Sequence, residues 1–438
     1  MIVLMPHCAF LSETSRMLEI WRALTARGVE ARIATHGGPF TRVYRDAGVP
    51  FDLIAPALDA ETCARFVGTI PGMSKSRRPV FEVGELRALA AGEVDYLRQG
   101  RATAVVTGFN LSALLSSRVA GVPLITEHAG SFVPPVFERG LVPPPLRSPI
   151  PLGELLPRRA KHFLANRGPT RVKFYCATLN AVARELGVEA VPSLAALLLG
   201  DLTLVTDVPE LTGVSKVDLE SWAPADPRPY RKSPQLRYVG PLYARLEVPV
   251  PDHVERFLAT PGPTVFVSLS STTPDRIRGI VAAVAQAGVK VLVAGTIHAL
   301  DDLASDRVCV GGVLPNHLIF PRAALGVIAG GQGTVQTALV GGVPFIGVPL
   351  QPEQDWNVAC AERAGAALRM TMKDACGSKM TAAVARMLAD PAARAAAKRL
   401  GAALSAVDGP SACAQAIIGY LGLGPAVVTN EARIATGP

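Results

Sequence analysis

The sequence has little charge and few aromatic residues. Charged residues make up 18% and aromatic residues 5% of the 438-residue chain, whereas 49% of it is hydrophobic. This balance excludes a disordered chain, which would be richer in charge and poorer in aliphatic residues. The many Ala, Val and Leu residues favour α/β layers over an all-β sandwich. The chain is also too long for one hydrophobic core, so we expect two domains of about 200 residues each.

Cysteine pairs and long apolar runs are missing as well. The seven cysteines stand singly, without a CxxC pair or metal-ligand spacing, so we predict reduced thiols and no metal site. No uninterrupted apolar run reaches the roughly 20 residues that a membrane-spanning helix needs. The start of the chain lacks the basic n-region of a signal peptide. We therefore predict a cytoplasmic protein.

The chain carries a surplus of positive charge. Its formal net charge is +8, but the basic residues are spread out and no nucleic-acid-binding motif accompanies them. We predict no nucleic acid partner. Anionic substrates and a lipid surface explain the charge equally well, so peripheral contact with the inner membrane stays open.

The first half of the chain alternates short apolar runs with helical periodicity. Strands are expected at 2–5, 30–35, 104–106 and 123–125, and helices at 14–27 and 111–119. Such alternation predicts a doubly wound parallel sheet over residues 1–222.

A stretch rich in proline, arginine and serine at 223–237 predicts an interdomain linker. Strands then fit 264–268, 289–294, 307–310, 325–328 and 345–348, which predicts a second doubly wound domain over 238–405. Residues 406–438 are expected to form one helix, near 411–421, and a tail. Since ligands of such sheets bind at the carboxyl ends of the strands, a cleft between the two domains is the expected site.

Residues 132–159 break this pattern. They contain eight prolines mixed with Leu, Val and Arg, so we expect neither a regular helix nor a central strand there. The segment is either a surface loop or an apolar and basic lid over an acceptor pocket, and both interpretations stay open.

The most informative stretch runs from 325 to 368. A strand leads into the turn Gly330-Gly331-Gln332-Gly333-Thr334 and a helix, and one strand later Glu353 and Gln354 open another helix. A glycine-rich turn at a helix N-terminus offers backbone amides to a phosphate. A carboxylate beside an amide suits the hydroxyls of a sugar. The order and spacing of these parts predict a nucleotide-sugar site.

This composite resembles the nucleotide-diphosphosugar motif of the UDP-glycosyltransferase-like (family 1) enzymes and their macrolide relatives, approximately HGGxGTxxEAxxxGVPxxxxPxxxDQxxNA. The segments at 238–242, 266–271 and 314–316 resemble further elements of that family. The resemblance implies a GT-B fold, with two facing Rossmann-like domains. It also implies inverting sugar transfer from a UDP- or dTDP-sugar to a hydroxyl of a small-molecule or lipid-like acceptor, with no metal and no cofactor beyond the donor.

The resemblance assigns donor binding to a set of residues in the second domain: Ser271, Asn316, Gly330, Gly331, Gln332, Gly333, Thr334, Glu353 and Gln354. Five positions depart from the family pattern, two of them by the replacements of Asp by Glu353 and of Gly by Ser270. Ala329 stands where the family has a phosphate-contacting His, Thr337 where a Glu holds the ribose, and Val313 where plant members stack a Trp on the base. The base of the nucleotide therefore stays open.

The resemblance also places a catalytic His between the first strand and the first helix, and Glu13 stands at that position here. A carboxylate can take the acceptor proton, and we expect the first turn of a helix to keep it ionised. Glu13 as base and Glu13 as a mere partner of the helix dipole, with Ser12 as N-cap, both stay open. His7 is the rival base. Phe109 and His128 are expected to line the acceptor pocket.

Two other functions stay open on this fold. A nucleotide-sugar epimerase would need acids and bases around the sugar but no acceptor pocket, so the long apolar segment at 132–159 argues against it. A non-catalytic binding partner is suggested by the missing family His and Glu.

Overall fold

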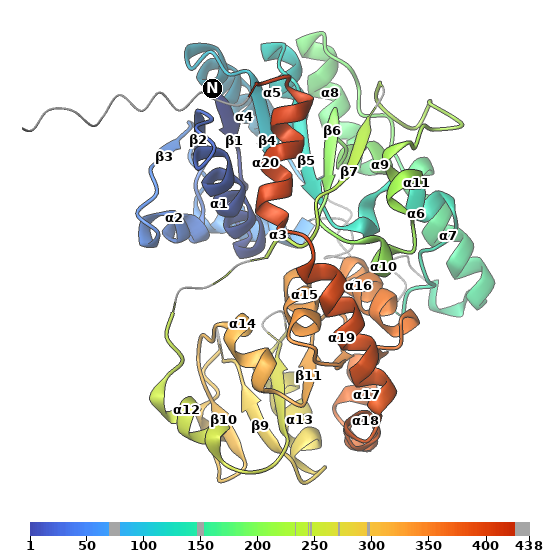
Figure 1. The fold of residues 1–438 in the computed structure, drawn as a ribbon. Coiled ribbons are helices and arrows are strands. Elements are labelled where there is room, and N and C mark those ends of the chain that lie inside the picture. The colour runs from blue at the N-terminus through green and yellow to red at the C-terminus, as the bar shows by residue number, and fades with distance from the viewer. Residues whose placement is uncertain are drawn as a thin grey trace, which may run out of the picture.

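The computed structural model describes residues 1–69, 79–146, 153–232, 234–243, 245, 248–269, 272–295 and 298–424. Within these residues the chain forms two lobes, each built around a parallel sheet (Figure 1). This arrangement confirms the predicted fold class of two doubly wound α/β domains.

The first sheet has seven parallel strands in the order β3-β2-β1-β4-β5-β6-β7. Its strands are β1 (Ile2–Leu4), β2 (Ala31–Thr35), β3 (Phe51–Leu53), β4 (Ala104–Thr107), β5 (Leu124–His128), β6 (Leu202–Val205) and β7 (Gln235–Tyr238). The order reverses between β1 and β4, so the loops that follow these two strands diverge to opposite faces of the sheet. A ligand crevice is expected at this point.

The second sheet has six parallel strands in the order β10-β9-β8-β11-β12-β13. Its strands are β8 (Thr264–Ser268), β9 (Lys290–Val293), β10 (Val308–Val310), β11 (Leu325–Ile328), β12 (Phe345–Gly347) and β13 (Ala367–Arg369). Here the order reverses between β8 and β11, directly before the glycine-rich turn. The predicted strands of this half are confirmed to within one or two residues.

Helices separate the strands as the parallel topology requires. Those of the first lobe are α1 (Leu11–Thr25), α2 (Arg42–Asp46), α3 (Ala60–Thr69), α4 (Val83–Gln99), α5 (Ala113–Ala120), α6 (Pro134–Glu138), α7 (Arg158–Arg171), α8 (Ala177–Leu186), α9 (Leu194–Leu197), α10 (Pro209–Thr212) and α11 (Lys216–Glu220). Those that follow are α12 (Asp252–Ala259), α13 (Pro274–Ala285), α14 (Asn316–Ile319), α15 (Gln332–Val340), α16 (Pro352–Arg363), α17 (Met372–Ala375), α18 (Ser378–Leu388), α19 (Pro391–Ser405) and α20 (Gly409–Tyr420). Short 3-10 turns are η1 (Pro39–Thr41), η2 (Gly130–Phe132), η3 (Gly153–Leu155), η4 (Phe174–Cys176), η5 (Asp301–Leu303) and η6 (Phe320–Arg322).

The predicted boundary between the domains was wrong. Residues 235–237 were assigned to the linker and Tyr238 to the second domain, yet all four form β7, which pairs with β6 in the first sheet. The strand is easy to miss because it is short and follows a proline-rich stretch, and its Leu236 alone is fully buried.

The last helix returns to the first lobe. After α19 on the second lobe, the chain crosses back and α20 lies along α1 (Figure 1). Its Cys413, Ala414 and Ile417 are buried in the same apolar cluster as β1 and α1. The two lobes are therefore tied by two chain crossings, one after β7 and one before α20.

The proline-rich segment contains more helix than expected. The prediction that 132–159 holds no regular helix was wrong, because α6 spans Pro134–Glu138 and α7 begins at Arg158. Pro134 and Pro135 occupy the first turn of α6, where a missing N–H costs nothing. Part of the suggested lid, residues 147–152, lies outside the described residues.

The two lobes share one apolar cluster. Val205, Val208 and Leu211 of the first lobe pack in the same buried cluster as Val335 and Trp356 of the second. Burial of this surface holds the carboxyl ends of the two sheets against each other. Across the described residues, none of the helices combines the length and the apolar character needed to cross a bilayer.

Candidate active site between the two domains

The glycine-rich turn faces the first lobe. Gln332, the first residue of α15, is buried, and its side-chain amide donates to the Thr206 carbonyl oxygen at 2.7 Å and to Thr206 Oγ1 at 3.0 Å. Gln336, one turn later, donates to the same carbonyl at 2.6 Å. Since Thr206 directly follows β6, these bonds join the carboxyl edges of the two sheets. The glycine-rich turn therefore lies at the interface between the two domains.

The interface is closed beside this turn. Asp207 accepts hydrogen bonds from the amide of Gly130 at 2.8 Å and from the side-chain amides of Gln332 and Gln336 at 3.3 Å each. Only about 10 Å³ of space remains among Asp207, Trp356 and their neighbours. Burial raises the pKa of Asp207 to about 6, so this carboxyl group at the domain interface holds its proton more tightly than an exposed one. Asp207 was not predicted as a site residue.

The turn itself has a closed side and an open side. Gly330 adopts φ +92°, and a Cβ there would lie 2.5 Å from Val358 and 2.8 Å from the carbonyl oxygen of Gln354. Gly331 has φ −58°, and a Cβ there would meet no described atom within 4 Å. Gly331, Gly333 and Thr334 are half-exposed, while Ala329 is buried. A phosphate can therefore approach the amides at the start of α15 from the Gly331 side.

Glu353 and Asn357 connect α16 to this turn. Glu353 accepts a hydrogen bond from the side-chain amide of Asn357 at 2.7 Å and one from the backbone amide of Gln332. Asn357 also donates to the Gly330 carbonyl oxygen at 3.0 Å. Burial raises the pKa of Glu353. Asn357 was not predicted as a site residue, although the family motif places an Asn at this spacing.

Gln354, which is predicted with Glu353 to bind the sugar, has a structural role. Gln354 is buried, and its Oε1 accepts a hydrogen bond from the amide of Leu350 at 2.9 Å. The bond braces the loop between β12 and α16. Its role toward a sugar stays a prediction.

Glu13 lies in the first lobe, inside the protein and not on its surface. The side chain is 0% exposed, and its Oε1 accepts hydrogen bonds from the amides of Gly108 at 3.0 Å and Phe109 at 2.8 Å. Its Oε2 has no hydrogen-bond partner among the described residues. The loops after β1 and β4 thus meet at the switch point of the sheet, and a carboxylate with one unused oxygen lies between them.

The interpretation of Glu13 as a simple partner of the helix dipole does not fit this geometry. The N-cap of α1 is Phe10 rather than Ser12, and the carboxylate bonds to another loop. Burial acts against the expected effect of the helix end on the ionisation of Glu13. Burial raises the pKa of Glu13 to about 7, and the nearby charge of Glu127 adds to the shift. Desolvation here outweighs both the helix dipole and the two amides.

Next to Glu13 is a buried ion pair that sequence spacing did not reveal. Arg16 Nε donates to both carboxylate oxygens of Glu127 at 2.8 Å. Gly108 separates the two acids, since a Cβ there would lie 2.7 Å from Glu127 and 3.1 Å from Glu13. The charge of Arg16 also acts on Glu353 in the second lobe. Glu13, the ion pair of Arg16 and Glu127, and Glu353 of the second lobe are therefore coupled electrostatically.

The raised pKa of Glu13 has a consequence for stability. Its folded-state pKa of about 7 lies above its ordinary value of 4.5, so the native state binds the proton more tightly than the unfolded chain. This contribution is fully present below pH 4.5 and is lost as the pH rises through 7. Between pH 5 and pH 8 we expect the wild type to lose about 2–3 kcal/mol more unfolding free energy than Glu13→Gln. Urea unfolding of both proteins at the two pH values measures the difference, and equal losses would contradict the buried placement of Glu13.

His7, Phe109 and His128 lie close to Glu13. The ring of His7 stacks on Phe66, with centroids 3.8 Å apart, and that of Phe109 meets His128 edge-on at 5.3 Å. Burial lowers the pKa of both histidines to about 3. His7 is therefore a weak base, which favours Glu13 over its rival. Phe10 joins Phe66 and Phe109 to form an aromatic wall beside the carboxylate.

Asn316 and Ser271 are the other residues predicted to bind the donor. Asn316 begins α14 and is half-buried, and the adjacent Val313 is 50% exposed. Ser271 lies outside the described residues. Thr337, which replaces the ribose-binding Glu of the family, donates its hydroxyl to the Gly333 carbonyl oxygen at 2.6 Å within α15. The described part of the chain has no group of three or more His, Cys, Asp or Glu side chains arranged to hold a metal ion.

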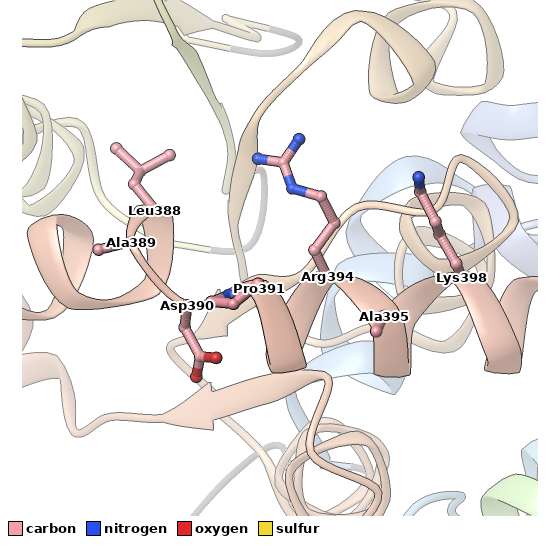
Figure 2. A pocket seen from close by; sticks show the side chains of 7 residues that line it. All are labelled: Leu388, Ala389, Asp390, Pro391, Arg394, Ala395 and Lys398. Atoms are coloured by element: carbon pink, nitrogen blue, oxygen red, sulfur yellow. The ribbon is translucent and has the colours of Figure 1, made fainter.

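A separate hollow lies elsewhere in the second lobe. It measures about 460 Å³ and lies where α18 ends and α19 begins, along Asp390, Arg394 and Lys398 (Figure 2). Arg394 reaches the carbonyl oxygen of Ala324, which precedes β11, so this hollow lies at the amino edge of the second sheet. The turn at Gly331 follows β11 and lies at the opposite edge. The hollow is therefore separate from the predicted donor site.

Comparisons with known proteins agree with this architecture. Residues 195–405 match the family described as UDP-glucoronosyl and UDP-glucosyl transferase. A PGL/p-HBAD biosynthesis glycosyltransferase of Mycobacterium tuberculosis is 28% identical over 332 residues, which cover 74% of this chain and 72% of the relative. Among solved structures, the glycosyltransferase VinC in complex with dTDP has a TM-score of 0.66 at 19% identity, covering 97% of this chain and 100% of that one. The spinosyn rhamnosyltransferase SpnG has a TM-score of 0.63 at 18% identity, covering 95% and 100%.

Proposed function

We propose that this chain, a GT-B glycosyltransferase similar to the UDP-glycosyltransferases, moves a sugar from a UDP- or dTDP-sugar to a hydroxyl group of an apolar acceptor. The acceptor is a natural product or a glycolipid, as the names of the relatives suggest. The observation that carries the proposal is the electrostatic link between two parts that belong to different lobes. The open turn at Gly331 belongs to the second lobe and the buried Glu13 carboxylate to the first, and the charge of Arg16 acts on both Glu13 and Glu353.

In the proposed reaction the donor diphosphate rests on the amides at the start of α15, with Glu353 and Gln354 at the sugar. Glu13 removes the proton from the acceptor hydroxyl as its oxygen attacks the anomeric carbon. The bond from that carbon to the diphosphate oxygen breaks, and the helix N-terminus stabilises the departing charge. Attack from the Glu13 side and departure on the α15 side invert the anomeric carbon. The proposal requires neither a metal nor a cofactor besides the donor.

The acceptor pocket is assigned to the aromatic wall beside Glu13. The ring centroid of Phe10 lies 6.0 Å from that of Phe66 and 5.6 Å from that of Phe109. Aromatic faces of this kind bind apolar rings and chains. This wall supports an apolar or lipid-like acceptor over a free sugar.

We propose that the protein contacts the nucleoside of the donor less tightly than its diphosphate. Thr337 gives its hydroxyl to its own helix and offers the ribose no carboxylate. A donor with one ribose hydroxyl fewer loses less at such a site, which supports a dTDP-sugar over a UDP-sugar. Both belong in the same test.

A donor screen by thermal unfolding tests the function. A nucleotide diphosphosugar at one hundred times its Kd should stabilise the protein by about 2.7 kcal/mol, which raises the unfolding temperature. We expect dTDP- and UDP-sugars to do so, and the corresponding nucleoside without phosphates to do nothing. If no diphosphosugar shifts the transition, the donor site is refuted.

Two further functions give distinct outcomes in the same preparation. Donor binding with neither hydrolysis nor transfer to any acceptor would favour a non-catalytic binding partner, which the missing family His at Ala329 suggests. Conversion of the donor sugar to its epimer without an acceptor would favour an epimerase. Transfer to an added apolar alcohol contradicts both.

A further inference from the structure

Helix α7 is strongly basic. Its fourteen residues include Arg158, Arg159, Lys161, Arg167 and Arg171 but no acidic residue, and Lys173 follows directly. A run of this composition is costly for a helix in isolation, because like charges a turn apart repel. Such a helix is stable when its cations face water or an anionic partner.

The outward face of α7 mixes cations with large apolar side chains. Arg159, Phe163, Arg167 and Arg171 follow each other at intervals of four residues, and all are exposed. Phe163 is 53% and its neighbour Leu164 43% exposed. The helix is anchored at Asn166, which is buried and bonds to both the amide and the carbonyl of Val142. The helix therefore presents one fixed face to its surroundings.

Two more exposed apolar residues flank α7 in the sequence. Leu155, before the helix, is 80% exposed, and Phe174, after it, is 53% exposed. Figure 1 shows α7 on the outside of the first lobe, beside α6. We call Leu155, Phe163, Leu164 and Phe174, with the exposed arginines of α7, the α7 face.

The cations of the α7 face lack acidic partners. None of Arg159, Arg167 and Arg171 is paired with an acidic side chain of the described residues. Elsewhere on the same lobe exposed arginines do have such partners, as in Arg87 with Glu185 and Arg139 with Asp218. The charge of the α7 face is therefore available to an external anion.

We propose that the α7 face docks the protein on the surface of a bilayer that contains anionic phospholipids. The arginines would pair with lipid phosphates, and the four apolar side chains would enter the boundary between headgroups and acyl chains. Charge complementarity selects anionic lipid, and the interleaved Phe and Leu side chains select a bilayer over RNA. An RNA backbone offers Leu155 and Leu164 no apolar phase to enter.

The position of α7 suggests that docking serves sugar transfer, and this role rests on the proposed function. Asn166 holds the loop at Val142, and four residues later the amide of Leu146 donates to Asp355 Oδ2 of α16 at 2.7 Å. The α7 face is thus linked to the interface where the two lobes meet. Docking would bring an acceptor held in the membrane near the proposed active site.

Flotation of the full chain with lipid vesicles tests the proposal. Vesicles of phosphatidylcholine with 30% phosphatidylglycerol should bind the protein, and vesicles of phosphatidylcholine alone should bind it far less. Raising the salt from 0.1 to 0.5 M should weaken the binding, since charges at the surface are screened. The triple variant R159Q/R167Q/R171Q should lose about fivefold in partition per arginine, or about a hundredfold altogether.

Two further sets of variants separate the effect of the α7 face from that of net charge and test its apolar residues. R386Q/K398Q/R399Q removes the same charge from exposed positions of α18 and α19 and should bind vesicles like the wild type. F163S/L164S should weaken binding to anionic vesicles while preserving the salt dependence. All variants should transfer sugar to a soluble acceptor at the wild-type rate.

Several outcomes would overturn the docking surface. Equal vesicle binding by the α7 and control triple variants would show that only net charge matters. Tighter binding of a single-stranded RNA than of vesicles, lost in the α7 variant, would assign the face to nucleic acid instead. Because vesicle binding is measured without a donor, docking can fail while transfer to soluble acceptors persists, and the reverse.

Discussion

Replacing Glu13 by glutamine is expected to lower the rate of sugar transfer by about 10²–10⁴-fold, the usual contribution of a positioned base. Glutamine keeps the oxygen that accepts from Gly108 and Phe109, so the loop geometry should survive. Donor binding should be unchanged, because the turn at Gly331 belongs to the other lobe. Initial rates at saturating donor, with the donor Kd from calorimetry, separate the two effects.

The pH profile identifies the base independently. Glu13 acts as a base only when ionised, and its pKa is raised to about 7 by burial, so kcat/KM of the wild type should rise with pH and level off above 7. His7, with its pKa lowered to about 3, would already be deprotonated across this range and would give no such limb. Glu61→Gln, in the exposed first turn of α3, is the matched control and should behave as wild type. Full activity of Glu13→Gln would make His7 the better candidate.

The fold was largely predictable because its strands are apolar runs separated by periodic helices. Strands such as β8 and β11 are buried along almost their whole length and appear in the sequence as short, mainly apolar runs, TVFVS and LGVI. The missed strand β3 is a different case, because its three residues are half-buried or exposed at the edge of the sheet. β13 lies at an edge of the second sheet, and only Ala367 of its three residues is buried. Edge strands lack the pattern on which the prediction depends.

The site was predictable only where its chemistry is local. The glycine turn and the start of α15 are adjacent in the sequence, so their arrangement follows from the chain itself. Glu13 could be placed by counting from the first strand, but its burial depends on Gly108, 95 residues away. The partner of Arg16 is 111 residues away, on β5. Sequence spacing therefore locates a side chain within its helix, whereas its pKa and its hydrogen-bond partners depend on residues about 100 positions away in the sequence.

Replacing Gly330 by alanine is expected to destabilise the protein and abolish donor binding together. The position has φ +92°, which costs a residue with a Cβ about 1–3 kcal/mol. The methyl group would also overlap the Gln354 carbonyl oxygen at 2.8 Å and Val358 at 2.5 Å, adding about 1–3 kcal/mol of overpacking. Thermal and urea unfolding measure the loss, which the inflexible backbone of Gln354 makes hard to relieve. This variant alone cannot show that the turn binds phosphate, because it damages the fold as well.

Replacing Gly331 by alanine removes that ambiguity. Its φ of −58° suits alanine, and the added methyl group meets no described atom within 4 Å, so the loss of stability at this N-cap should stay near 1 kcal/mol or less. The space that the methyl group fills is the side from which a phosphate would approach the amides of α15. Losing even one charged hydrogen bond there costs about 1.5–3 kcal/mol, so affinity for the diphosphosugar should fall at least about tenfold. A donor that binds Gly331→Ala as tightly as the wild type must sit elsewhere, and the diphosphate would have to be assigned to another edge of the second sheet.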